Sequence, residues 1–122
     1  TQDRSAVSRI FRSTDRGRTW RKTAEVSDQF WSNLFEHRGA LYLLGTTYEY
    51  GRVVIRQSKD CGKSWSAASY LSEDTGYHTA PVPVARHAGR LWRGMEWHPE
   101  GRWGNFEALM ISIAEEADLM DA

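Results

Sequence analysis

The sequence predicts an all-β protein in which antiparallel sheets repeat along the chain. Two patterns support this prediction. An octapeptide, S-x-D-x-G-x-[ST]-W, occurs at 13–20 and again 45 positions later at 58–65. A second pattern, apolar-x-x-His-x-Gly-x-Leu-aromatic, occurs at 34–42 and again 50 positions later at 84–92. Short apolar segments that repeat at such a period, separated by turn residues, are typical of proteins built from successive antiparallel sheets.

Each fixed position of the octapeptide suits a tight turn between two strands. The Asp carboxylate accepts backbone N–H groups, the Gly takes a positive φ, the hydroxyls satisfy leftover polar groups and the Trp packs beneath the hairpin. We therefore expect both tryptophans, Trp20 and Trp65, to be largely buried. The residues predicted to build the two turns are Ser13, Asp15, Gly17, Thr19, Trp20, Ser58, Asp60, Gly62, Ser64 and Trp65.

The two octapeptides resemble the Asp-box, or bacterial neuraminidase repeat. Two copies at this spacing imply a β-propeller of the sialidase type, which is built from four-stranded antiparallel blades. We interpret the chain as a single partial propeller domain of about two and a half blades within a longer protein. The segment 1–26 is the expected outer half of blade one, 27–71 is blade two, and 72–122 is blade three with a degenerate box beginning at Ser112.

Strands are expected where apolar residues lie between turn residues. The apolar runs 41–44 and 53–55 lack clean alternation, which is expected when neighbouring sheets cover both faces of a strand. The tail at 114–120 is expected to coil into a helical turn. The expected strands are 6–12, 19–26, 30–36, 40–46, 52–57, 65–70, 79–86, 90–96 and 105–113.

Composition argues against several classes of partner. Lys and Arg together number 16, as do Asp and Glu, so no basic surplus is available for phosphates, and nucleic acid is not an expected partner. The longest apolar run, 40–44, is far shorter than a membrane span, and no membrane partner is expected. Cys61 is the single cysteine and cannot form an internal disulfide.

Antiparallel order separates the loops into two groups at opposite ends of each sheet. The turns at 37–39 and 87–89 share one end with the octapeptide turns, and the remaining loops share the other end. In Asp-box propellers ligands bind at the rim opposite the boxes, so the resemblance assigns the candidate site to these remaining loops. Aromatic rings there suit the C–H face of a sugar, and charged groups suit its hydroxyls. The substrate-binding candidates are Trp31, Tyr48, Glu49, Arg102 and Trp103.

Three residues are candidates for catalysis, namely Asp3, His78 and Glu96. His78 opens an inner strand at the expected mouth of the site, and histidine titrates near neutral pH. Sialidase-type enzymes carry an acid/base Asp just before the strand that leads to the first box, and by resemblance Asp3 occupies a comparable place. No metal site is expected, because His78 and His98 are 20 residues apart and lack a clustered third ligand. No cofactor is expected either.

Purely structural or solvent-exposed roles for these candidates stay open at this point. Trp31 and Trp103 also suit packing between blades, because aromatic residues often build propeller cores. Glu49, Glu96 and Glu100 also suit solvated loop positions, because glutamate is mostly exposed in proteins.

The leading hypothesis is a sialidase-like glycoside hydrolase that acts on a glycan terminus. The Arg-Ile-Pro motif of the family is not present in this chain, and the family's Tyr and Glu pair comes from later blades. The resemblance therefore implies an exo-glycosidase only for the full-length protein, with a carbohydrate ligand and the remaining blades as partners. It also implies a bacterial protein that is secreted or periplasmic. The alternatives are a non-catalytic Asp-box propeller that binds glycan or protein, and a small lectin that closes its ring by oligomerising.

Overall fold

The computed structural model describes residues 6–80 and 82–121, and within these ranges it contains ten strands and no helix. None of the described residues therefore forms a helix that is long and apolar enough to cross a membrane. The all-β prediction is confirmed. The strands are β1 (Val7–Arg12), β2 (Arg21–Ser27), β3 (Phe30–His37), β4 (Ala40–Thr46), β5 (Val53–Ser58), β6 (Ser69–Tyr70), β7 (Tyr77–His78), β8 (Ala85–His87), β9 (Arg90–Trp97) and β10 (Glu107–Ala114).

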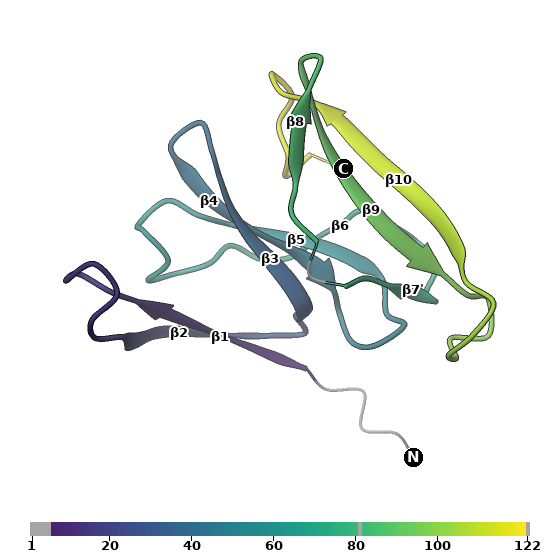
Figure 1. Ribbon diagram of the computed structural model, residues 1–122, viewed down its shortest axis with the longest axis horizontal. Helices are drawn as coiled ribbons and strands as arrows, with labels where there is room; N and C mark the ends of the chain where they lie inside the picture. Colours follow the sequence, from purple (N-terminus) through teal and green to yellow (C-terminus); the bar gives the residue numbers. More distant parts are fainter. Residues whose placement is uncertain (1–5, 81, 122) are drawn as a thin grey trace.

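The strands form three antiparallel sheets that follow one another across the molecule (Figure 1). The first sheet pairs β1 with β2, and the second runs β3-β4-β5-β6 in chain order. In the third sheet β9 lies between β10 on one side and both β7 and β8 on the other. The order of pairing within each sheet thus follows the order of strands along the chain.

Several local expectations were wrong. The strand expected at 79–86 is formed only at its end, because β7 ends at His78, β8 begins at Ala85, and Pro83 between them has no N–H to donate to a ladder. Of the strand expected at 65–70, only β6 is formed. The tail forms hydrogen-bonded turns rather than a helical turn, with Ala117 N donating to Ala114 O. Ser112, the expected start of a degenerate box, lies in β10, where its hydroxyl accepts a hydrogen bond from Arg90 Nε.

The main core lies between the second and third sheets. Strand β4 is buried along both faces, and this explains, as predicted, why apolar and polar residues do not alternate along it. Leu43 of β4 faces the first sheet and packs with Ile10 and Val26 in a smaller cluster. The buried residues of the main core are Ala40, Tyr42, Leu44, Val53, Ile55, Leu91, Met95 and Leu119.

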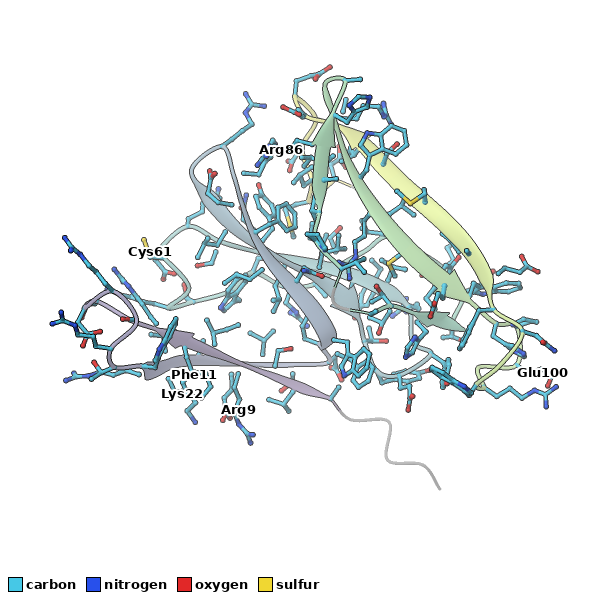
Figure 2. The ribbon with its side chains drawn as sticks, viewed as in Figure 1. Arg9, Phe11, Lys22, Cys61, Arg86 and Glu100 are labelled. Carbon is cyan, nitrogen blue, oxygen red and sulfur yellow. The ribbon has the colours of Figure 1, made fainter. Side chains whose placement is uncertain are left out.

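His37 ties the second sheet to the third beside the β3–β4 turn. Because a guanidinium can only donate, Arg86 Nη1 donates to His37 Nδ1 at 2.9 Å, and the imidazole must carry its proton on Nε2. That Nε2 donates to the carbonyl of Glu115 at 2.9 Å. Figure 2 shows Arg86 at this end of the molecule, far from Glu100 of the β9–β10 loop. His37 therefore has a structural role, as its place in a turn indicates.

The first octapeptide closes the β1–β2 turn with a compact set of hydrogen bonds. Ser13 Oγ accepts from Gly17 N at 2.7 Å, and Asp15 accepts from both the backbone N and the hydroxyl of Thr19 at 2.9 and 2.6 Å. Hydrogen bonds from Thr19, and then from Ser13, lower the pKa of Asp15 to about 2. Gly17 takes a φ of 84°, which a side chain would strain.

The second octapeptide repeats this geometry after β5. Ser58 Oγ accepts from Gly62 N at 2.9 Å, and Asp60 accepts from Ser64 N at 2.9 Å. Hydrogen bonds from Ser64, and then from Ser58, hold the pKa of Asp60 far below its usual value. Gly62 has a φ of 82°.

The two box tryptophans differ in burial, and the expectation for Trp20 was wrong. Trp20 is 61% exposed and covers only its own turn, where Nε1 donates to Gly17 O at 3.1 Å. Trp65 instead packs against the smaller cluster that contains Ile10 and Leu43. The reason is position: the second box lies against the first sheet, whereas no described sheet covers the first box.

Candidate functional site

The loops opposite the box turns gather around β7, which carries His78 and lies at the lower right in Figure 1. His78 of β7 lies directly across from Glu96 of β9, and its Nδ1 is 3.1 Å from Glu96 Oε2. Because an ionised carboxylate only accepts, Nδ1 carries a proton and donates it to Glu96. The His78 side chain is 5% exposed and that of Glu96 is 42% exposed. A buried imidazole is thus oriented by a carboxylate that reaches solvent.

Four aromatic rings surround His78. The distances from the imidazole centroid are 5.4 Å to Tyr50, 5.6 Å to Trp31, 5.7 Å to Phe106 and 5.9 Å to Trp103. Trp31 is 50% exposed and Trp103 is 76% exposed, so their rings reach solvent beside the buried histidine. We call these four rings, together with His78 and Glu96, the His78 cluster.

A bulge in β3 places Trp31 in the cluster. The register of β3 against β4 shifts between Phe30 and Asn33, and Trp31 takes a φ of 36°. Gly45 of β4 makes room for the bulge, because a Cβ at Gly45 would lie 2.2 Å from Ser32 Oγ. A left-handed backbone at a bulky residue is strained, and such strain is concentrated at functional sites.

Interlocked backbone hydrogen bonds position Tyr50 and the β9–β10 loop. Gly76 N donates to Tyr50 O at 2.7 Å, and His98 N donates to Gly76 O at 2.9 Å. A Cβ at Gly76 would lie 2.4 Å from His98 O, so only glycine permits this close approach. His98 Nδ1 accepts from Glu100 N at 3.1 Å and thereby folds the loop that carries Trp103. The β4–β5, β6–β7 and β9–β10 loops are thus fixed against one another.

The buried side chain of Arg93 links the segments that carry the cluster. It lies on β9, is 2% exposed, and donates to Asn33 Oδ1 of β3, to Thr79 Oγ1 at 2.8 Å and to Ala80 O at 3.1 Å. Its Nε has no hydrogen-bond partner among the described residues, and burial lowers the pKa of Arg93. Asn33 follows the bulge of Trp31, and Thr79 follows His78, so Arg93 fixes two sides of the cluster together.

The structure brings together four of the residues singled out from the sequence, namely Trp31, His78, Glu96 and Trp103. Arg102 lies outside the cluster, because its Nε pairs with Glu100 Oε2 at 2.7 Å on the exposed loop.

The remaining candidates are Glu49, Tyr48 and Asp3. Glu49 is exposed in the β4–β5 loop, and Tyr48 of the same loop accepts a backbone hydrogen bond from Gly51 N at 2.8 Å. Asp3 lies outside the described residues.

Sequence reasoning missed Tyr50 and Phe106 as members of the cluster. Tyr50 shares its loop with Tyr48 and Glu49, and its aromatic type beside Gly51 was the available signal. Phe106 was placed inside an expected strand at 105–113, whereas β10 begins one residue later at Glu107.

The cluster has a negative electrostatic environment. Burial is the largest cause that raises the pKa of Tyr50, and the carboxylates of Glu49 and Glu96 raise it further. Within 6–80 and 82–121, no three His, Cys, Asp or Glu side chains are grouped so that they could hold a metal ion. The chemistry available at these residues is therefore aromatic stacking, hydrogen bonding and proton transfer.

Comparisons of the chain with protein-family models, with curated proteins and with solved structures found no match. The case for function therefore rests on the side chains of the His78 cluster and on the two octapeptide turns.

Proposed function

We propose that the chain is part of a sialidase-like Asp-box β-propeller that binds a glycan terminus at the His78 cluster. We propose further that the full-length protein is a glycoside hydrolase. The observation that supports the site is the gathering of four aromatic rings and the His78–Glu96 pair. The strand β7, which carries His78, lies at the end of the molecule opposite both box turns (Figure 1). The repeated octapeptide turns and the sheets that meander in chain order support the propeller.

The exposed rings suit the apolar face of a sugar. Trp31 and Trp103 present ring surface to solvent, and stacking on such surface contributes affinity beyond simple burial. Glu96 uses one carboxylate oxygen for His78, which leaves Oε1 to accept hydrogen bonds from sugar hydroxyls. Together these groups offer both an apolar and a polar contact within one small surface.

His78 is suited to proton transfer. Glu96 orients the imidazole through Nδ1 and stabilises the imidazolium that would form if Nε2 took a proton. In a hydrolase, Nε2 would accept a proton from the attacking water or return one to the leaving group. The role of Asp3 as general acid stays a proposal that rests on the family resemblance.

A non-catalytic glycan-binding propeller is the second candidate, and one observation favours it. Among the described residues, Glu96 is the only carboxylate that pairs with His78. Glycosidases commonly use a pair of carboxylates that flank the scissile bond. A single engaged carboxylate fits binding as well as it fits catalysis.

The test compares two exposed tryptophans in the full-length protein. Trp103→Ala is expected to weaken glycan binding about three- to tenfold, the effect of losing one ring contact. Trp20→Ala is the matched control, because Trp20 is similarly exposed but lies at the box end. Calorimetric titration against a glycan panel measures both variants. Equal affinities for the two variants would contradict the assignment of the site.

Turnover separates the two candidates. Substitution of a general acid or base typically lowers the rate about 10²- to 10⁴-fold. We expect His78→Gln and Glu96→Gln to lose turnover to this extent while the fold, followed by circular dichroism, is retained. Glycan binding by the wild-type protein without any turnover of the bound glycans would favour the non-catalytic propeller.

A further inference from the structure

The loops at the cluster end carry more negative than positive charge. The described loops 28–31, 47–52, 71–76 and 98–106 contain two arginines, Arg52 and Arg102, and no lysine. Their carboxylates are Asp28, Glu49, Glu73, Asp74 and Glu100.

Both arginines of these loops have partners within the chain. Arg102 Nε pairs with Glu100 Oε2 at 2.7 Å, and the guanidinium of Arg52 lies 3.7 Å from the centroid of the Tyr70 ring. Arg93, which lies below the cluster, is buried and gives its Nη groups to Asn33, Thr79 and Ala80. Among the described residues of these loops, five carboxylates therefore face two arginines, and each arginine already has a carboxylate or an aromatic partner.

The acceptors at the cluster are, by contrast, open. Glu96 Oε1 receives no hydrogen bond from the described residues, and the side chain is 42% exposed. Glu49 is exposed. Burial is the largest cause that raises the pKa of Tyr50, and the carboxylates of Glu49 and Glu96 raise it further. An anionic sugar placed on these rings would face repulsion from the Glu96 and Glu49 carboxylates.

The exposed tryptophan rings add to this preference for positive charge. The face of an indole ring attracts a cation, and recognition of ammonium groups by several aromatic rings beside a carboxylate is a recurrent arrangement. Trp31 and Trp103 lie 5.6 and 5.9 Å from the imidazole that Glu96 holds, so rings and carboxylate are adjacent. A protonated amine on a sugar ring would contact both.

We infer that the glycan terminus bound at the His78 cluster carries a protonated amine, as in a non-acetylated amino sugar, and carries no carboxylate or phosphate. This inference rests on the proposed carbohydrate function. It differs from the sialic acid specificity that the family resemblance implies, because carboxylates outnumber arginines in the described loops and Glu96 lies open beside the rings.

The test is a matched ligand series on the full-length wild-type protein, immobilised through the exposed thiol of Cys61 at the box end (Figure 2). The three probes are the disaccharide of glucosamine, its N-acetylated counterpart and sialyllactose. The first two share rings and linkage and differ at the amine. We expect the amine form to bind about tenfold more tightly than the acetylated form at low salt, and this ratio to fall as salt screens the interaction.

Variants then assign the preference to one side chain. Glu96→Gln is expected to bring the affinities for the two disaccharides together, whereas Glu116→Gln, at an exposed residue on the opposite end, is expected to leave their ratio as in the wild type. If the acetylated disaccharide or sialyllactose binds as tightly as the amine form, the inference is overturned and the carbohydrate site stands. If none of the three binds, the proposed function is overturned as well.

Discussion

The contrast between the two box tryptophans gives a direct prediction about stability. Both occupy the last position of the same octapeptide, yet Trp65 packs on the cluster of Ile10 and Leu43 whereas Trp20 is 61% exposed. Trp65→Ala should therefore destabilise the fold more than Trp20→Ala. Equal burial, which the sequence predicts, would instead give equal losses.

The magnitude follows from the difference in buried area. A Trp side chain buries up to about 250 Å², and Trp65 is partly buried whereas Trp20 is 61% exposed, so we take the difference in buried area as about 80 Å². At about 25 cal/mol per Å² this difference amounts to about 2 kcal/mol. Trp65 Nε1 is buried and has no hydrogen-bond partner among the described residues, so removal of this donor offsets part of the loss. We expect Trp65→Ala to cost about 1 to 2 kcal/mol more than Trp20→Ala.

Urea unfolding followed by far-UV circular dichroism measures the free energies of unfolding without relying on tryptophan fluorescence. Trp65→Phe is the matched control, because it keeps most of the ring contacts and removes the unpaired Nε1. Its free energy of unfolding should be much closer to that of the wild type than the value for Trp65→Ala is. Equal losses for the two Ala variants would refute the packing of the second box against the first sheet.

Three further perturbations test other parts of the structure. Arg93→Ala leaves buried acceptors unpaired, so we expect a loss of about 3 kcal/mol in urea unfolding, and a smaller loss for the more voluminous Arg93→Met. The pKa of Asp15 is lowered from 3.8 to about 2 in the fold, so its contribution to stability is present above pH 4 and is lost as the pH falls through about 2. Unfolding midpoints of Asp15→Asn should consequently lack this pH dependence, and an unchanged profile would contradict the turn hydrogen bonds. Gly45→Ala should displace the bulge of Trp31 and weaken glycan binding while preserving the sheets, which titration and circular dichroism would detect.

The sequence predicted the strands best where the signal is local. The octapeptide specifies its turn through contacts within eight positions, as between Ser58 and Gly62, and β4 appears within the bounds expected from its apolar run. Whether the tryptophan of a box is buried depends instead on a neighbouring sheet, and no residue within the octapeptide shows that Trp20 is exposed. The strand expected at 79–86 failed because its pairing is divided between two segments on β9.

The candidate site could be located from the sequence but could not be assembled from it. Antiparallel order was enough to assign Trp31, His78, Glu96 and Trp103 to one end of the sheets. The pairing of Arg102 with Glu100, by contrast, is settled by side-chain geometry on a loop. Residue type alone made Arg102 a candidate for substrate binding, whereas in the structure its Nε pairs with Glu100 on the same loop.

The side chains of the His78 cluster are held in place before any ligand arrives. Gly45 and Gly76 each allow a backbone approach that a Cβ would block, and Arg93 joins the segments that follow Trp31 and His78. Ordering such groups upon binding would otherwise oppose affinity, so a scaffold that fixes them in advance favours tight recognition of a small ligand. The strained φ of Trp31 is consistent with this reasoning, because a relaxed backbone at that position would withdraw an exposed ring from the imidazole that it contacts. Packing between sheets alone would not require a half-exposed tryptophan to be held in a strained conformation.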